Sequence, residues 1–293
     1  MTPAVGDFVR FTPNQHGESI IDEILPRNSW IKRKSAGRTS DENVLAANVD
    51  FMLIVTPVDK TFSIRRIERF LVLAESGRVR PVIVITKSDI CDPVDMAVNI
   101  GSIEEITDAE VIETSSVSGL GIDRLQSMMT AGKTFCAVGT SGAGKSTLLN
   151  RIAGSGVAAT SDIRSKDNKG RHTTTGRHMY RLEEGAWFID TPGLREVGIT
   201  DDTEAVEDTF QEIKALAPQC FFADCTHSHE PLCAVLEAVS DGRIKPERYE
   251  SYMRLRRESE NHALRTQHRL EKKRQDKNLS KRVKAAGKRK KRF

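Results

Sequence analysis

The chain contains 293 residues, of which 38% are hydrophobic and 29% are charged, and its formal net charge is +4. It has no run of about 18 apolar residues and no charged start followed by an apolar segment, so the sequence predicts neither a membrane-spanning helix nor an export signal. A chain of this length exceeds the usual size of a single hydrophobic core. We therefore expect a cytoplasmic, multidomain monomer without a membrane partner.

The charge is distributed unevenly along the chain. Residues 241–293 contain 20 Lys and Arg against 7 Asp and Glu, a net charge of +13, whereas residues 1–240 carry −9. Such a basic run can bind the phosphates of RNA without reading their sequence, although it can also be a solvated helix followed by a tail. Aromatic residues are sparse in this run, so we expect any RNA contact there to be electrostatic.

From residue 51 onwards the hydrophobic pattern alternates between buried strands and amphipathic helices. This alternation predicts an α/β fold with a mostly parallel sheet and helices on both faces. Segments 178–182 and 186–189 predict an antiparallel hairpin at the sheet edge. The other predicted strands are 51–56, 81–86, 109–114 and 134–138, and the helices are 64–75, 94–106, 121–129 and one that begins at Gly144-Lys145.

The first motif that carries chemistry is Thr86-Lys87-Ser88-Asp89, directly after the second predicted strand. The Asp89 carboxylate can accept hydrogen bonds from the ring N1–H and the exocyclic amine of guanine together, a pair that adenine lacks. Lys87 can lay its aliphatic stem along the base. A Lys-x-Asp triplet alone is also common in turns. Here the next strand is followed by Ser115-Ser116, which resemble the loop that backs the guanine carbonyl in Ras-like proteins.

The strongest single motif runs from Gly139 to Ser146 and reads Gly-Thr-Ser-Gly-Ala-Gly-Lys-Ser, between a predicted strand and a predicted helix. Its glycines allow successive N–H groups to face a β-phosphate, Lys145 can reach the β- and γ-phosphate oxygens, and the Ser146 hydroxyl can ligate Mg²⁺. A glycine-rich turn without a ligand is the alternative. By itself the motif does not distinguish ATP from GTP.

Asp190-Thr191-Pro192-Gly193 follows the predicted hairpin. Asp190 would hold Mg²⁺ through water and the Gly193 N–H would contact the γ-phosphate, although the same tetrapeptide is also a good β-turn. Leu194 comes next, near the point where many GTPases place a water-orienting Gln, so hydrolysis needs another group. The residues expected to bind GTP are Thr86, Lys87, Ser88, Asp89, Ser115, Ser116, Gly139, Thr140, Ser141, Gly142, Ala143, Gly144, Lys145, Ser146, Thr147 and Gly193.

The guanine motif precedes the phosphate loop, which reverses the order of ordinary GTPases and predicts a circularly permuted P-loop GTPase domain. Further along, the chain contains Cys220, Cys225, His227 and Cys233 at short spacings. Three cysteines and one histidine close a tetrahedral Zn²⁺ site, the pattern of structural rather than catalytic zinc. His229 is a competing ligand. Residues 215–239 have little apolar surface, so we expect metal binding to supply much of their stability.

The motif order, residues 170–175 (Gly-Arg-His-Thr-Thr-Thr), the motif at Asp190 and the cysteine–histidine cluster together resemble the circularly permuted ribosome small-subunit-dependent GTPase A family. The resemblance covers the chain from about Gly6 to Glu258. It implies a GTPase domain between an N-terminal OB barrel and a C-terminal helical zinc domain. It also implies GTP hydrolysis during late maturation of the small ribosomal subunit, whose RNA the protein would bind and whose binding would stimulate hydrolysis.

The same resemblance implies that His172 positions the attacking water, a role that imidazole can fill near neutral pH, unless it is an ordinary loop histidine. Thr174, or otherwise Thr173, would complete the Mg²⁺ site. We expect GTP hydrolysis to act as a release signal. The alternatives are a GTP-gated RNA chaperone or sensor with negligible turnover, which Leu194 favours, and a zinc and nucleic-acid-binding module with a vestigial nucleotide site.

We expect a partial OB-like segment at 1–45, the GTPase domain at 46–198, the zinc domain at 199–260 and a basic tail at 261–293. The chain starts in what resembles the middle of the family's barrel, so a closed barrel is not expected. Thr86 replaces the family's usual Asn and lacks an amide that could bridge the nucleotide and the phosphate loop, which predicts weaker nucleotide affinity. Leu232 stands where Gly is frequent.

Overall fold

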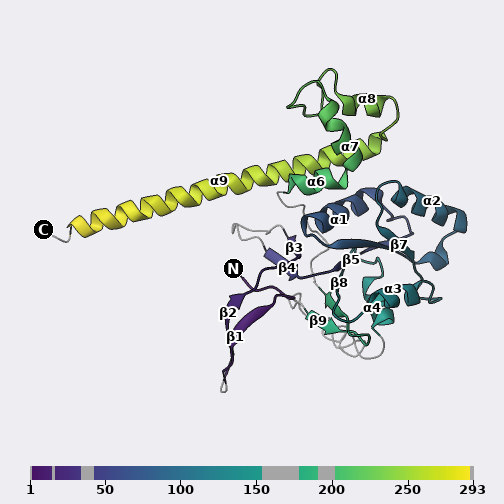
Figure 1. The fold of residues 1–293 in the computed structure, drawn as a ribbon, viewed down its shortest axis with the longest axis horizontal. Coiled ribbons are helices and arrows are strands. Elements are labelled where there is room, and N and C mark those ends of the chain that lie inside the picture. The colour runs from purple at the N-terminus through teal and green to yellow at the C-terminus, as the bar shows by residue number, and fades with distance from the viewer. Residues whose placement is uncertain (1, 15–16, 34–42, 154–177, 191–201, 291–293) are drawn as a thin grey trace.

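The computed structural model describes residues 2–14, 17–33, 43–153, 178–190 and 202–290, and a six-stranded sheet forms its centre (Figure 1). The strand order is β7-β6-β5-β8-β10-β9, and all neighbours run parallel except β10 and β9. The strands are β5 (Phe51–Pro57), β6 (Arg80–Thr86), β7 (Glu110–Glu113), β8 (Thr134–Val138), β9 (His178–Arg181) and β10 (Trp187–Asp190). The predicted mostly parallel sheet and the antiparallel hairpin at its edge are confirmed.

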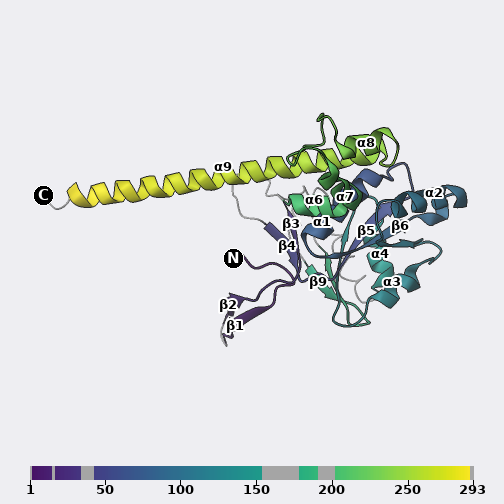
Figure 2. The same ribbon diagram turned by 45° about the horizontal axis from the view of Figure 1, so that its top comes forward.

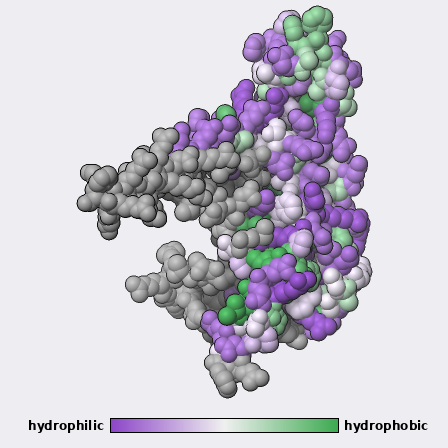
Figure 3. Space-filling view, turned by 60° about the vertical axis from the view of Figure 1, so that its left-hand side comes forward, coloured by the Kyte–Doolittle hydropathy of each residue, from purple (hydrophilic) through white to green (hydrophobic). Residues whose placement is uncertain are grey.

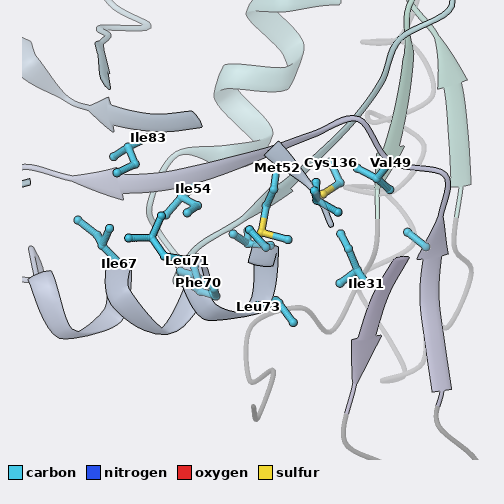
Figure 4. Close-up of a cluster of buried hydrophobic side chains, with 14 of the residues drawn as sticks. Ile31, Val49, Met52, Ile54, Ile67, Phe70, Leu71, Leu73, Ile83 and Cys136 are labelled. Atoms are coloured by element: carbon cyan, nitrogen blue, oxygen red, sulfur yellow. The ribbon is translucent and has the colours of Figure 1, made fainter. Parts of the chain in front are cut away.

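Four helices cover the two faces of this sheet. Side chains of the strands alternate between them, as the pleat requires: Met52 and Ile54 of β5 pack toward one face, and Leu53 and Val55 toward the other. Figure 4 shows the first cluster, in which Met52 and Ile54 lie against Phe70 and other residues of α1. The helices are α1 (Ile64–Ser76) and α2 (Pro93–Glu104) on that face, and α3 (Ile122–Met128) and α4 (Lys145–Ile152) on the other.

The described N-terminal residues form two separate antiparallel strand pairs. The strands are β1 (Val9–Thr12) with β2 (Ile20–Ile24), and β3 (Trp30–Arg33) with β4 (Asn43–Ala47). Ile31 and Leu45 join the buried cluster under α1, whereas Phe8 and Phe11 are more than half exposed. Within the described residues the N-terminal part is therefore two strand pairs, which agrees with the expected partial β segment.

The C-terminal part is helical. A third buried cluster joins its helices around Phe210, Tyr252 and Leu255, and it also includes Val72 of α1. Figure 2 shows that α9 leaves this cluster and extends far from the sheet. The elements are α6 (Thr203–Thr209), α7 (Gln211–Leu216), the 3₁₀ turn η3 (Ala217–Gln219), α8 (Ala234–Ser240) and α9 (Pro246–Lys290).

The length and composition of a helix decide whether it could span a membrane. Over the residues that the structure describes, no helix combines the length and the apolar composition needed to span a bilayer. The longest helix, α9, contains the basic run that the sequence shows after residue 241.

Candidate nucleotide and metal sites

The predicted nucleotide motifs meet at one edge of the sheet. The phosphate loop follows β8, the guanine motif follows β6, Ser115-Ser116 follow β7, and Asp190 ends β10. Because these strands run parallel, their carboxyl ends lie at the same edge, which is where open α/β sheets bind ligands. Motifs separated by up to about a hundred residues are thereby brought together.

The backbone of the phosphate loop passes close to β5. Gly139 has a φ of 145°, and a Cβ atom on it would lie 2.3 Å from the Val55 carbonyl oxygen, so only glycine fits there. Gly144, with a φ of 91°, is the N-cap residue directly before α4. The Lys145 Nζ donates to the carbonyl oxygens of Gly139 and Thr140 at 2.7 and 2.6 Å. The Lys145 side chain therefore folds back over the phosphate loop. Ser146 and Thr147 follow in the first turn of α4.

Thr86 joins the guanine motif to the phosphate loop. Its buried hydroxyl donates to the Ala143 carbonyl oxygen at 2.7 Å. The sequence led us to expect that a threonine here gives up the amide bridge between the nucleotide and the loop. The structure shows that the contact with the loop itself is made by the hydroxyl. The effect on nucleotide affinity stays a prediction.

The carboxylate expected to read guanine is held by the next loop. Asp89 accepts a hydrogen bond from the Ser115 hydroxyl at 2.6 Å, and the same hydroxyl oxygen accepts the N–H groups of Val117 and Ser118. The N–H of Ser88 donates to the Thr114 carbonyl at 3.2 Å. The two loops thus form one unit in which the Asp89 side chain has a fixed direction.

One residue near this site was missed by sequence reasoning. Asp59, in the turn after β5, accepts from the Lys87 Nζ at 2.8 Å, and from the N–H and hydroxyl of Thr61. The hydrogen bonds from Lys87 and Thr61 hold the pKa of the Asp59 carboxyl well below its usual range. An Asp-x-Thr turn at the carboxyl end of a parallel strand was the signal that could have pointed to it.

The second missed contact ties α4 to the guanine side. The Arg151 side chain of α4 donates to the Ser116 carbonyl at 2.9 Å. His172, Thr174 and Gly193 lie outside the described residues, as do Thr173 and Leu194. Among the expected magnesium ligands, Ser146 and Asp190 are described.

The four predicted zinc ligands converge. The Nδ1 atom of His227 lies 3.5 Å from the sulfurs of both Cys220 and Cys233, and those sulfurs are 3.8 Å apart. One ligand atom from each of these residues and from Cys225 falls within 4.8 Å of every other. Burial lowers the pKa of His227, which favours the neutral imidazole that binds metals. His229, the competing candidate, is not part of this group.

The loop that carries these ligands is strongly constrained. His227 and Leu232 both have a φ of 59°, in the left-handed region that favours glycine. Glu230 accepts the N–H groups of Thr226, Ser228 and His229. Geometry, donor types and burial therefore fit a four-coordinate metal site with no ligand position left open.

The metal cluster packs against the buried core of the helical part. Cys233 belongs to the third buried cluster, with Cys220 and Cys225 packed against it. The Tyr249 hydroxyl of α9 donates to the His227 carbonyl at 2.7 Å. Tertiary packing against α7 and α9 thus adds to the stability that we expected to come largely from the metal.

A buried ion pair connects this helical part to helix α1. Arg248 of α9 binds Glu68 of α1 at 2.8 Å and Glu212 of α7 at 2.6 Å, and its guanidinium lies 3.9 Å from the centre of the Phe210 ring. The side chains of Glu68 and Arg248 are 2% and 10% exposed. Ser251 also donates to Glu68. The pair of Glu68 and Arg248 is therefore buried on both sides, whereas Glu212 is partly exposed.

Comparisons with known proteins agree with this architecture. The sequence model of the RsgA GTPase family matches residues 24–200. The Small ribosomal subunit biogenesis GTPase RsgA of Methanosarcina acetivorans is 46% identical over 255 residues, which cover 86% of this chain and 69% of that protein.

Two solved structures are similar as well. YjeQ from Thermotoga maritima has a TM-score of 0.65 at 33% identity, over 88% of this chain and 85% of that one. YloQ, described as a circularly permuted GTPase, has a TM-score of 0.61 at 29% identity, over 89% of this chain and 82% of that one. These similarities confirm the permuted P-loop fold and the expected family. The chain therefore belongs to the RsgA GTPase family and is a GTP-hydrolysing enzyme.

Proposed function

We propose that this GTPase acts in the cytoplasm as a monomer in late maturation of the small ribosomal subunit, whose RNA it binds and whose binding stimulates hydrolysis. Hydrolysis is the signal for release. The names of its relatives, which are small ribosomal subunit biogenesis GTPases, support the partner and the compartment. The basic α9 supports contact with RNA phosphates.

The observation that carries the nucleotide assignment is the pair of hydrogen bonds at the sheet edge, from Thr86 to Ala143 and from Ser115 to Asp89. They support the proposal because they link the segment that contains Asp89, the proposed reader of guanine, to the proposed phosphate loop. In the proposed site Asp89 accepts from guanine, and Lys145 exchanges the loop carbonyls for β- and γ-phosphate oxygens. The proposed GTP-binding residues are those at positions 86–89, 115–116, 139–147 and 193.

Ser146, Thr174 and Asp190 would hold Mg²⁺, which neutralises phosphate charge when bound. Serine at the start of α4 and an aspartate at the end of β10 fit the oxygen donors that this ion prefers. We assign His172 to positioning the attacking water, because Leu194 cannot do so and imidazole can accept a proton near neutral pH.

Cys220, Cys225, His227 and Cys233 would hold one structural Zn²⁺. Their soft sulfur and imidazole donors and their mutual distances fit this ion. The metal would fix the loop between η3 and α8 and would take no part in hydrolysis, because all four positions are filled by the protein.

The release signal follows from the chain path. Residues 191–201 connect Asp190, beside the proposed γ-phosphate position, to α6, which packs between α1 and α9. A change at the phosphate is therefore passed along the backbone into the helical part that carries the metal loop and the basic helix.

The test is to measure GTP and ATP hydrolysis with and without small ribosomal subunits at matched salt. We expect stimulation confined to GTP. Lys145→Ala should abolish both hydrolysis and nucleotide-dependent subunit binding. Lys133→Ala is the control, since Lys133 pairs with Asp50 at the opposite end of β8. GTP binding without any stimulation would contradict the proposal, and subunit binding by Asp190→Asn that still depends on the nucleotide would contradict the release route.

A further inference from the structure

Two adjacent aromatic side chains are exposed on the metal loop. Phe221 and Phe222 directly follow Cys220 and are 71% and 41% exposed, and neighbouring Leu232 is 73% exposed. Figure 3 shows hydrophobic surface at the tip of the molecule, at the top of that view, where the helical part lies. Large apolar side chains that stay outside the core of so small a module mark an interaction surface.

The loop presents these rings in a defined arrangement. Their centroids are 5.0 Å apart and their planes are at 84°, an edge-to-face pair. The Phe221 N–H donates to the Leu232 carbonyl and the Phe222 carbonyl accepts the Cys225 N–H, both at 3.2 Å. Because Cys220 and Cys225 on either side belong to the metal cluster, the backbone that carries the two rings is held at both ends.

The core of the module is complete without these rings. Its buried cluster is formed by Phe210, Tyr252 and aliphatic side chains of α7, α8 and α9, and neither Phe221 nor Phe222 belongs to it. A role in folding therefore does not account for their position.

The surroundings favour RNA over a protein as the occupant. Three apolar side chains are far fewer than the roughly 20 residues per side of a stable protein interface. Exposed Arg254 and Arg257 lie on the adjoining part of α9, and Arg256 donates to the Thr226 carbonyl of the metal loop. The exposed rings of the metal loop and the exposed arginines of the helix that contacts this loop offer the two kinds of group that bind single-stranded nucleic acid, rings for bases and cations for phosphates.

We infer that Phe221 and Phe222 form a stacking surface for an unpaired base of RNA. This inference rests on the proposed binding of small-subunit RNA and names the kind of nucleotide that the metal loop takes. Stacking needs the flat π-face of an aromatic ring, whereas the basic helix needs only phosphates. The two contributions can therefore be separated by experiment.

The experiment measures binding of the full chain to a labelled, unstructured 12-nucleotide RNA and to the same sequence as a duplex, by fluorescence anisotropy over a range of salt. Phe221→Leu and Phe222→Leu keep an apolar side chain but remove the π-face. Each should weaken single-strand binding by about fivefold or more, as expected for one lost stacking contact. Duplex binding and the salt slope should not change. Phe221→Trp should bind at least as tightly as the unmodified chain.

Leu264→Ala is the matched control, because Leu264 is an exposed apolar residue of α9 without a ring. Metal content of each variant shows whether the loop is intact. Equal losses for single strand and duplex, no loss in the Leu variants, or no single-strand preference in the unmodified chain would each overturn the inference. Unchanged RNA binding with weaker binding to whole subunits would point to a protein partner instead. Stimulated GTP hydrolysis, measured in parallel, tests the proposed function separately.

Discussion

Asp59 gives the guanine motif a contact that lies outside the motif itself. Its carboxylate holds the Lys87 ammonium at 2.8 Å while Thr61 fixes the carboxylate from the other side. Lys87 can lie along a base only if its side chain has the right direction, so Asp59 is a positioning residue. We expect Asp59→Asn to weaken GDP binding by about three- to fivefold, the upper range for a partly exposed ion pair, as measured by calorimetry.

A double-mutant cycle separates this role from a general loss of charge. Lys87→Met keeps the aliphatic stem but has no ammonium group, so Asp59→Asn should have no further effect in that background. Asp241→Asn, which disrupts an exposed pair with Arg243, serves as the control. Equal effects of Asp59→Asn with and without Lys87 would refute positioning through the lysine.

A second carboxylate, Asp7, makes N-terminal stability depend on pH. Burial alone would raise its pKa, but hydrogen bonds from Arg27 and from the Ala4 N–H hold the pKa of Asp7 below the ordinary 3.8. The side chains of Asp7 and Arg27 are 2% and 9% exposed. Because the folded state favours the ionised form, the stabilisation is present above about pH 4 and is lost as the pH falls through the folded value.

Asp7→Asn should therefore destabilise the N-terminal strand pairs by about 3 kcal/mol near neutral pH, as expected when one partner of a buried ion pair is removed. The difference from the unmodified chain should shrink as the pH falls below about 4. Hydrogen exchange of β1 to β4 against pH checks this. Glu23→Gln, which removes the partner of Arg10 in an exposed pair, should leave exchange nearly unchanged. A difference that grows in acid would contradict the assignment.

Among the secondary-structure elements, the junction of α1 with α9 depends on the buried pair of Glu68 and Arg248. Glu68→Gln leaves Arg248 buried with one carboxylate partner, Glu212, and should destabilise the junction by about 3 kcal/mol. Thermal unfolding measures this loss. If the junction relays the subunit signal, stimulated hydrolysis should fall more than basal hydrolysis.

The exposed pair of Arg65 and Glu250 joins the same two helices and provides the matched control. Glu250→Gln should change stability by no more than about 0.5 kcal/mol. Equal unfolding temperatures for the Glu68 and Glu250 variants would show that burial of the first pair does not matter.

The elements also show what the sequence could predict. The strands β5, β6 and β8 were recognisable because continuous apolar runs such as Val82 to Ile85 mark strands buried on both faces. The helix predicted at 94–106 begins one residue earlier, at Pro93, because the Asp92 side chain accepts the Val94 N–H and caps the helix there. For residues 261–293 the sequence predicts a basic tail, whereas α9 continues as one helix from Pro246 to Lys290.

Other features depend on contacts that no local pattern contains. Arg248 and Glu68 are 180 residues apart in the chain, and nothing in either segment names the partner. The exposure of Phe221 was also unpredictable, because apolar residues beside cysteines are typical of a small core. The zinc ligands were predictable because their residue types and spacing follow directly from coordination chemistry. The expected domain limits and the roles of His172 and Thr174 stay predictions.

For the whole molecule, metal removal should separate basal GTP hydrolysis from its stimulation by the small ribosomal subunit. The ligand cysteines Cys220, Cys225 and Cys233 and His227 belong to the C-terminal part, and the two clusters that pack the sheet contain none of these four residues. A chelator should therefore loosen residues 220–233 and leave basal GTP hydrolysis within about twofold, while subunit-stimulated hydrolysis is lost.

Hydrogen exchange and hydrolysis measured on the same sample check this expectation. Added Zn²⁺ should restore both the protection of the loop and the stimulation. Loss of basal hydrolysis on chelation, with the sheet still protected, would show that the metal loop contributes to the nucleotide site itself.

The strand order β7-β6-β5-β8-β10-β9 also matters while the chain is being synthesised. The half of the sheet that carries the proposed guanine motif, β5 to β7, leaves the ribosome before β8, which then adds to the open edge of β5, followed by the β10–β9 hairpin at the edge of β8. Each new unit joins an existing edge, and no strand has to be inserted between two that are already paired. The nascent protein can thus build its sheet outward as it emerges, and it acquires its phosphate loop only after the base-reading side is in place.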